Sequence, residues 1–449
     1  MIIKITAKNT TALLKIIYKK FFNSKMNTII NIILDNLKIF YIFLYSTLIF
    51  GFFFNENTLG GSISDFAEFW RMSNLFARDF LSTIQDYNLT GHRQSPVHLI
   101  WQSLFIRLNI SETLYRLLNL HLSLLLILSF YKVLKLKFNK IKNNILILTS
   151  AIIFLSPSFR SSAIWPDSYI FALLFFVISI YFYLKFEISK AKKLSYALLN
   201  IFFLAISSYI TPNFCFFSIF FFYKFWVHFK KSLNLYILIT TNLLLAYPAF
   251  YFLYILKINF LIPTASSDVG IDIFSMQNLS NKILCTSSII FFHLLSFFLV
   301  FYKDIKKKIK KIDIFYLIFL IIFTTVLYSK FNYEIIHKLL GGGGIFYKIS
   351  YITQNFYFFF VISFISIYIL IKIITNNLQV GNIILIITLF IFQPQTTIYH
   401  NYFEPLILIL IFSLFNLKIN SYFKNNLNIT ILYICSLLFL FINLLRIFF

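Results

Sequence analysis

The chain has 449 residues, of which 59% are hydrophobic and 21% aromatic, while only 12% are charged. A soluble protein of this length would divide into several domains with polar surfaces, and this composition cannot supply those surfaces. Apolar runs of about 20 residues, the length that crosses a hydrocarbon core of roughly 30 Å, recur from Leu37 onward. The composition therefore excludes a soluble protein and predicts an all-α, polytopic membrane protein.

Hydropathy along the chain predicts about thirteen transmembrane helices. Their ranges are 37–54, 112–131, 145–157, 168–184, 195–210, 213–227, 233–256, 284–302, 312–329, 350–371, 382–393, 405–417 and 429–445. The fifth and sixth spans leave an alternative open, because only Thr211 and Pro212 separate two runs that together would form one kinked helix. If they merge, the count is twelve and the downstream topology inverts.

Charge predicts the orientation of these spans. The formal net charge of +25 comes from 40 Lys+Arg against 15 Asp+Glu, and 28 of the 40 basic residues lie in the N-terminal segment or the inner loops if the N-terminus is cytoplasmic. Cytoplasmic loops carry an excess of Lys and Arg. We therefore expect an integral protein of the inner (cytoplasmic) membrane with its N-terminus inside and its C-terminus outside. The basic charge then reports orientation, and no nucleic-acid partner is expected.

The chain divides into two unequal parts. Residues 1–36 are basic and amphipathic, and we expect a cytoplasmic segment that lies on the anionic inner leaflet, with Met26 as an alternative start to Met1. Residues 37–449 form one multi-span domain. The three cysteines fall in separate apolar runs, which predicts neither a disulfide nor a metal site.

The longest outer loop, residues 55–111, contains the best catalytic candidates. Residues 64–87 predict an amphipathic surface helix with Ser64 as N-cap and with Asp65 and Glu68 in the first turn. Their i, i+3 spacing places both carboxylates on one helical face. Acids at a helix N-terminus also complement the helix dipole, so a purely structural role for both residues stays an alternative.

Candidate ligands for a substrate lie at the outer side as well. All seven arginines fall there, and arginine suits phosphate because its planar guanidinium is always charged and bidentate. The run Gly341–Gly344, beside Lys348, is either a hinge or a phosphate-binding loop. His400 and Glu404 precede the twelfth span and are expected to line the same cavity. The candidate substrate-binding residues are Arg71, Arg93, His98, Arg160, Asp167, Lys348, His400 and Glu404.

These patterns together resemble one family of membrane enzymes. They are Asp65 and Glu68 early in a long first loop, Arg93-Gln94-Ser95-Pro96, Pro157-Ser158-Phe159-Arg160, Trp165-Pro166-Asp167 and Tyr402-Phe403-Glu404-Pro405. They resemble the GT-C class of glycosyltransferases, and most closely the branch of protein O-mannosyltransferases and bacterial lipid A aminoarabinose transferases. The chain departs from that pattern in the Asp-x-x-Glu spacing, since the family's acids are adjacent.

The resemblance implies a function. It implies inverting transfer of a sugar from a polyprenyl-phosphate carrier to a lipid, glycan or protein acceptor at the outer membrane face, with Asp65 catalytic and Glu68 secondary. No tightly bound cofactor and no metal site are expected, while a need for a divalent cation stays open. The alternative is a secondary transporter, or a flippase or polymerase of lipid-linked glycans. Transporters place ionisable groups near the membrane midplane, whereas the acids here gather in outer loops, which favours the transferase.

Overall fold

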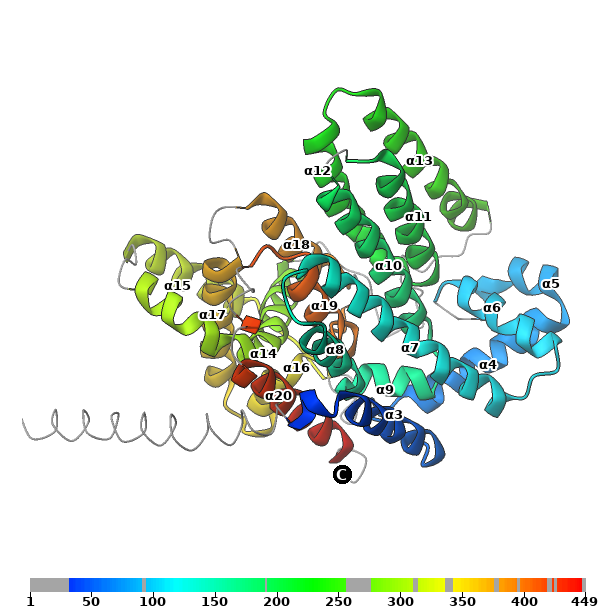
Figure 1. Ribbon diagram of the computed structural model, residues 1–449, viewed down its shortest axis with the longest axis horizontal. Coiled ribbons are helices and arrows are strands. Elements are labelled where there is room, and N and C mark those ends of the chain that lie inside the picture. Colours follow the sequence, from blue (N-terminus) through cyan, green and yellow to red (C-terminus); the bar gives the residue numbers. More distant parts are fainter. Residues whose placement is uncertain are drawn as a thin grey trace, which may run out of the picture.

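The computed structural model describes residues 32–90, 94–189, 192–255, 276–309, 314–335, 342–374, 379–393, 396–417, 422–423 and 426–445. Within these residues the chain forms helices and no strand (Figure 1). The N-terminal part has α3 (Leu37–Phe53), α4 (Ser62–Arg78), α5 (Phe80–Gln85), α6 (Pro96–Arg107) and α7 (Glu112–Lys137). Next come α8 (Asn143–Ala151), α9 (Pro157–Ile164), α10 (Ser168–Ile188), α11 (Leu194–Ile210), α12 (Phe217–Phe229) and α13 (Leu233–Phe250). The C-terminal part has α14 (Met276–Ile309), α15 (Ile314–Ser329), α16 (Gly344–Ile352), α17 (Phe356–Ile374), α18 (Val380–Ile391), α19 (Leu406–Ser413) and α20 (Asn426–Leu445).

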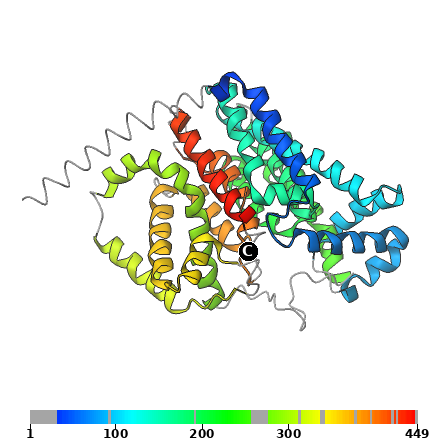
Figure 2. The same ribbon diagram turned by 90° about the horizontal axis from the view of Figure 1, so that it is seen from below.

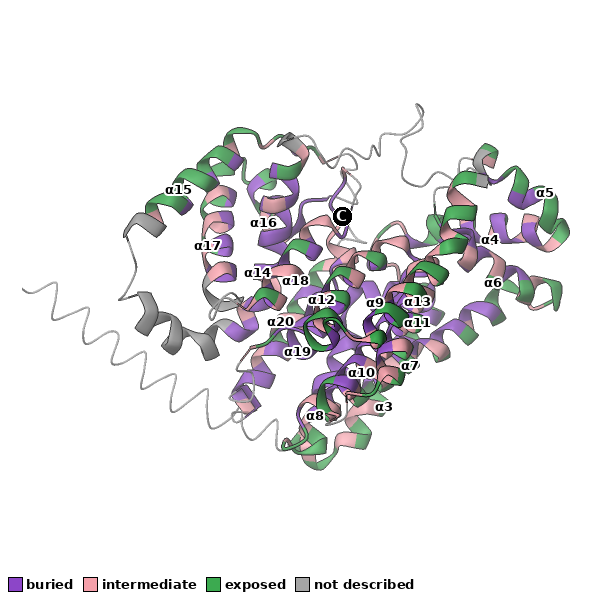
Figure 3. Cartoon of the chain, turned by 90° about the horizontal axis from the view of Figure 1, so that it is seen from above, coloured by how far each residue is buried: buried purple, intermediate pink, exposed green. Residues whose placement is uncertain are grey.

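Several of these helices are long and apolar enough to cross a membrane. Five described helices meet that standard, or six if one bent pair counts as a single span. Buried residues concentrate around α9, α10 and α19, whereas outer helices such as α15 are largely exposed (Figure 3). The exposed positions of α13 include Leu243, Leu244 and Tyr247, which are 64–70% accessible. Such a surface is stable against lipid and not against water. The described residues are therefore all-helical, as predicted, and their long apolar helices are compatible with a membrane protein, while the count of thirteen spans stays a prediction.

The open question about the fifth and sixth spans is resolved in favour of two helices. Helix α11 runs antiparallel to α10, because Asn200 donates to the carbonyl of Ser179 at 2.9 Å and Ser207 donates to that of Ala172 at 2.7 Å. Helix α12 runs parallel to α10, since the ring contacts advance together along both helices, from Phe176–Phe217 to Phe186–Phe229. The chain therefore reverses between α11 and α12, in the 3₁₀ turn Pro212–Phe216.

The expected third span and the loop after it are corrected. Helix α8 tightens into a 3₁₀ turn, Ile152–Leu155, and residues expected to form an outer loop instead form the short helix α9, all of whose residues are buried. The axis bends by 68° at the break. Ser156 explains this local fold, because its hydroxyl caps the N–H of Phe159 at 3.0 Å and Pro157 follows at the first helical position. Hydropathy alone does not register this restart.

The first loop folds as surface helices, as predicted, but the helix predicted over residues 64–87 starts earlier and is divided at Asp79 into α4 and α5. Helix α4 begins at Ser62 after Gly61, so Ser64 lies inside the helix and the expectation that it is the N-cap was wrong. Asp65 is in the first turn, whereas Glu68 lies beyond it. Helix α4 packs on α6 around a small separate core of Phe69, Met72, Phe76, Ile84, Tyr87 and Leu99.

The helices form three neighbouring groups. The group α4–α6 lies at one end and α14–α17 at the other, with α7–α10 and α19 between them (Figure 1). Helix α20 crosses back to the first described helix, since the rings of Tyr433 and Phe40 lie 5.7 Å apart (Figure 2). Of the predicted N-terminal segment 1–36, the structure describes only the last five residues.

Candidate functional site

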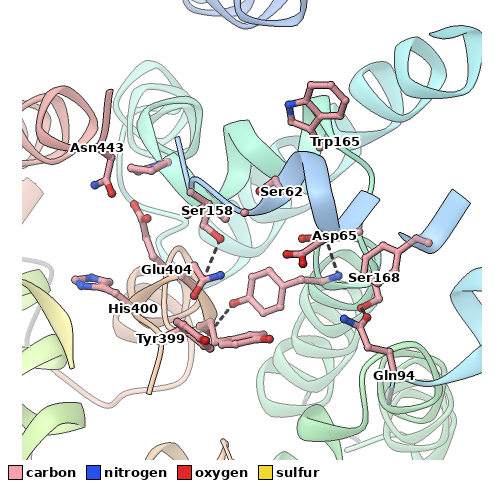
Figure 4. Close-up of a pocket in the computed structure, with 18 of the residues that line it drawn as sticks. Ser62, Asp65, Gln94, Ser158, Trp165, Ser168, Tyr399, His400, Glu404 and Asn443 are labelled. Carbon is pink, nitrogen blue, oxygen red and sulfur yellow. Dashed lines mark hydrogen bonds between the residues drawn. The ribbon is translucent and has the colours of Figure 1, made fainter. Parts of the chain in front are cut away.

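A polar cavity of about 320 Å³ lies where the N-terminal, central and C-terminal parts meet. Figure 4 shows Asp65 on one side of this space, with Glu404 and His400 on the other. The lining comes from segments far apart in sequence: Leu59 to Phe69, Gln94, Pro157 to Tyr169, Lys348, Tyr399 to Glu404, and Phe439 with Asn443 of α20. Five candidates from the sequence analysis are thereby brought together: Asp65, Asp167, Lys348, His400 and Glu404.

Asp65 projects into the cavity from the first turn of α4. The residue is accessible to solvent in the cavity, and its carboxylate has no hydrogen bond or ion pair with any described residue. The protein that surrounds the cavity desolvates it and raises its pKa. A carboxylate that is accessible, unpaired and of raised pKa can accept a proton from a bound molecule.

Asp167, in contrast, has its oxygens engaged within the protein. One oxygen caps α10 by accepting from the N–H of Tyr169 at 3.0 Å, and the other accepts from the hydroxyl of Ser162 at 2.6 Å. Burial raises the pKa of Asp167 to about 6, and the nearby negative charge of Asp65 contributes to the rise. Asp167 therefore shapes the cavity wall and adds negative potential next to Asp65.

Glu404 and His400 enter the cavity from the short 3₁₀ turn His400–Tyr402 and the segment that leads into α19. Glu404 is 7% exposed, and burial raises its pKa to about 8 although Ser156 and Ser158 donate hydrogen bonds to it. Burial also holds the pKa of His400 well below its usual range, and the positive charge of Lys348 contributes. Both groups are therefore neutral near neutral pH.

The imidazole of His400 contacts a second imidazole. Nε2 of His400 lies 3.0 Å from Nε2 of His293 in α14. His293 lies in an apolar run of the sequence, where an isolated histidine carries no sign of a distant partner. The pairing joins residues 107 positions apart, so no local pattern could have predicted it.

Three predicted ligands lie elsewhere, and one is outside the described residues. Arg71 pairs with Glu68 at 2.6 Å on the exposed side of α4, so neither residue lines the cavity. His98 is buried between α4 and α10, against the rings of Phe69 and Phe171. Arg93 falls in the gap 91–93.

Arg160 is buried in an ion pair instead of facing the cavity. Its Nε donates to Glu56 at 2.6 Å, and the same guanidinium donates to the hydroxyl and the carbonyl of Thr47. The two charged side chains are 5% and 8% exposed. With its donors engaged in this way, Arg160 fixes the end of α3 against α9. The sequence analysis missed Glu56, whose partner lies 104 positions away.

The described part of the glycine run, Gly342–Gly344, has a structural role at the start of α16. Gly343 and Gly344 have φ values of +80° and +84°, and Gly343 donates its N–H to the carbonyl of Ile398 at 2.8 Å. A side chain at Gly342, Gly343 or Gly344 would meet Tyr333, Tyr347 or Ile289, respectively. The run thus starts α16 in a conformation that favours glycine, and α16 carries Lys348 to the cavity.

Other lining residues were also absent from the sequence predictions. They include Tyr399 and Asn443, which are ordinary residues in an aromatic- and Asn-rich chain and give no compositional signal, whereas Gln94 and Tyr402 entered only as members of short motifs. Across the described ranges, no group of three His, Cys, Asp or Glu side chains is placed to hold a metal ion.

Comparison with known proteins adds no relative. No family model, no curated protein and no solved structure matches this chain.

Proposed function

We propose that this protein is an inverting, GT-C-like glycosyltransferase that moves a sugar from a polyprenyl-phosphate carrier to an acceptor at the outer face of the membrane. The observation that supports it most is the arrangement of the cavity. An unpaired carboxylate, Asp65, lies across the cavity from a neutral imidazole, His400, and a cation, Lys348, lines the same cavity.

The chemistry of the transfer matches these groups. The hydroxyl of the acceptor attacks the anomeric carbon and loses its proton to Asp65, while the bond from that carbon to the phosphate oxygen breaks and the phosphate leaves with the electron pair. Negative charge then grows on the phosphate, where the ammonium of Lys348 stabilises it. Attack from the face opposite the phosphate inverts the anomeric centre.

The membrane arrangement belongs to the same proposal. With thirteen spans and the N-terminus inside, the loop with α4–α6 lies outside, beside lipid-linked donors presented at that face. Asp65 follows the end of α3 by about one dozen residues, so it stays near the headgroup region where a lipid-borne phosphate would sit. Glu68, paired with Arg71 away from the cavity, has no direct part in the transfer.

Asp65→Asn tests the proposal, with Glu68→Gln as the matched control on the same helix. The sugar transferred from a panel of polyprenyl-phosphate sugars to lipid acceptors would be measured in liposomes. We expect Asp65→Asn to lower turnover by roughly 10²-fold or more, because a positioned proton acceptor is lost, and Glu68→Gln to stay near wild type. Near-normal turnover of Asp65→Asn with an active donor would overturn the assignment.

A proton-coupled transporter is the second candidate, and one observation favours it. Helices α8 and α9 form a bent pair, and the buried, ionisable Glu404 lies against the break, where Ser156 and Ser158 donate to it. Broken helices with buried acids are typical of transporter sites. Mass spectrometry of lipid that copurifies with the protein separates the two candidates: a polyprenyl phosphate supports the transferase, and a bound small solute supports the transporter.

A further inference from the structure

A pair of imidazoles, His293 and His400, lies beside the polar cavity, and His400 lines it. Nε2 of His293 and Nε2 of His400 are 3.0 Å apart, a hydrogen-bond distance that requires one nitrogen to carry a proton and the other to accept it. The rings of Phe292 and Phe439 pack against the pair, with centroids 5.7 and 4.8 Å from that of His400. In such surroundings the pair holds a single proton between the two Nε2 atoms.

The second ring nitrogen of His400 has no partner. Nδ1 of His400 is buried and makes no hydrogen bond with any described residue, although the residue lines the polar cavity. A buried polar atom without a partner costs free energy unless a ligand or water supplies one. Other atoms of His400 line the cavity, so a bound molecule reaches this nitrogen by displacing part of the cavity wall.

Behind the histidine pair lies a second, small cavity. It has a volume of about 30 Å³ and is lined by Glu404, His293, Ser156 and Ser296 among apolar side chains. A space of this size with several polar groups suits one buried water. Glu404 lines both cavities, so this residue lies between the small cavity and the polar one.

The direction of hydrogen bonding follows from Glu404. A buried carboxyl group that forms no ion pair among the described residues is stable in its neutral form, which is a hydrogen-bond donor. Glu404 then donates to the water, and the water donates to Nδ1 of His293. Nε2–H of His293 donates to Nε2 of His400, which leaves Nδ1 of His400 protonated.

We propose that Glu404, one water, His293 and His400 form a directed hydrogen-bond chain that presents the Nδ1–H of His400 to a phosphate oxygen bound beside Lys348. The identity of the phosphate rests on the proposed function, whereas the tautomer of His400 does not. Besides His400 and Glu404, the charged and titratable groups that line this site are Lys348, Asp65, Asp167, Tyr169, Tyr399 and Tyr402.

The chain can also supply a proton to the leaving phosphate. As the bond to the anomeric carbon breaks, the phosphate oxygen takes the proton from Nδ1 of His400, and Nε2 of His400 takes the proton from Nε2 of His293. His293 in turn takes a proton at Nδ1 from the water, and Glu404 restores the water and becomes a carboxylate. The acceptor's proton, held by Asp65, returns through the polar cavity to Nδ1 of His400, and the same transfers run in reverse until Glu404 is protonated again, so the protons and both histidine tautomers are restored over one cycle.

The tautomer is tested by nitrogen-15 NMR of the full chain with labelled histidine, reconstituted in lipid. The chain has seven histidines, and His400→Gln and His293→Gln assign the two signals. We expect neutral rings at neutral pH, Nδ1 of His400 protonated, and a scalar coupling across the Nε2–Nε2 hydrogen bond in the unmodified protein. A His400 that is protonated at Nε2 or fully cationic overturns the proposal, whether or not the protein shows transferase activity. The coupling is read without any variant, so a variant that fails to fold leaves the test intact.

The ligand is tested by binding of farnesyl phosphate, with inorganic phosphate and farnesol as the comparison probes. Losing a hydrogen bond to a charged oxygen should weaken the binding of farnesyl phosphate about 10- to 100-fold in His400→Gln. His121→Gln is the matched control, because His121 bonds only to the carbonyl of Leu117 in its own helix, and it should bind as the unmodified protein does. Equal affinity of His400→Gln and His121→Gln, or farnesol bound as tightly as farnesyl phosphate, overturns the phosphate assignment.

Discussion

At the scale of single residues, three carboxyl groups face one cavity in three different environments. Asp65 is accessible and unpaired. Asp167 caps α10 and accepts a hydrogen bond from Ser162, and Glu404 is buried between the polar cavity and the small one. Each environment sets the protonation state, because desolvation favours the neutral acid and hydrogen-bond donors favour the ion. Of the three, only Asp65 is accessible to a ligand and has a carboxylate without a hydrogen bond or ion pair, which is why we propose it as the base.

Glu404 should make the stability of the fold depend on pH. Burial raises its pKa from 4.5 to about 8, so the folded protein keeps a proton that the unfolded chain loses over this range. The stability that Glu404 contributes is complete below pH 4.5, declines as the pH rises, and is lost by about pH 8. We expect the Tm of the unmodified protein to fall between these limits more steeply than that of Glu404→Gln, measured by thermal unfolding in detergent. Parallel curves for the two proteins would mean that the carboxyl group is ionised in the folded state.

The buried pair of Arg160 and Glu56 should act on stability and not on donor binding. Removing one partner leaves a buried charge alone, which costs roughly 3–5 kcal/mol, so Arg160→Met and Glu56→Gln should each lower the free energy of unfolding strongly. The double variant should lose less than the sum of the two single losses. Arg71→Met, which breaks the exposed pair with Glu68, is the control and should cost about 1 kcal/mol or less. If Arg160→Met kept the free energy of unfolding of the unmodified protein but bound the donor weakly, Arg160 would be a phosphate ligand, as the sequence predicted.

At the scale of elements, the cavity is built where helices break. Helix α9 restarts at Ser156 and Pro157, α16 starts at the glycine run, and α19 follows Glu404. Each break leaves a short irregular segment or a helix end beside the cavity. Ser158, Lys348 and His400 come from these three places and line the cavity together. In a membrane protein such irregular backbone is tolerated only where protein or water surrounds it, which the cavity provides.

Gly343 should be essential to the start of α16. Its φ of +80° is strained for other residues, and a side chain there would meet the ring of Tyr347. Gly343→Ala should therefore cost roughly 1–3 kcal/mol and displace Lys348 from the cavity. Gly381→Ala is the matched control, since its new methyl would meet the flexible end of the Lys224 side chain at 3.1 Å and the ring of Phe220 at an ordinary contact distance of 3.5 Å. Thermal unfolding compares the two variants, and equal stability would contradict a conformational role for Gly343.

The sequence predicted these elements unevenly, for physical reasons. Apolar runs predicted the long helices, and the amphipathic pattern around Asp65 predicted α4, because both signals are local. The alternative at Thr211 and Pro212 stayed open, since a proline permits either a kink or a reversal, and the packing of Phe217 and Phe221 on α10 decided it. The partners of Arg160 and His400 could not be predicted, because both are set by packing between segments over 100 positions apart.

At the scale of the whole molecule, the cavity joins parts of the chain that are remote in sequence. Its lining runs from Leu59 to Asn443, and α20 closes it from the C-terminal side. A single helix or hairpin therefore cannot form the site, and it exists only when the N-terminal and C-terminal parts have packed together. This dependence also explains why short motifs identified candidate residues without identifying their geometry.

Orientation in the membrane is the property on which the outer-face chemistry depends. The excess of basic residues in the expected inner loops predicts that the loop with Asp65 is outside and that the lysine-rich end of α14 is inside. Asn57 lies in the turn between α3 and α4, and Lys308 lies near the end of α14, well beyond its candidate span Asn278–Phe297. Single cysteines at these two positions, in a chain whose own cysteines are replaced because Cys215 is exposed, report the two sides independently. An impermeant thiol reagent added to intact cells should modify Asn57→Cys alone, and permeabilised cells should show both. If intact cells modify Lys308→Cys and protect Asn57→Cys, the cavity that contains Asp65 lies toward the cytoplasm, where a carrier displayed on the outer leaflet cannot reach it, and the transferase would have to work on the inner face.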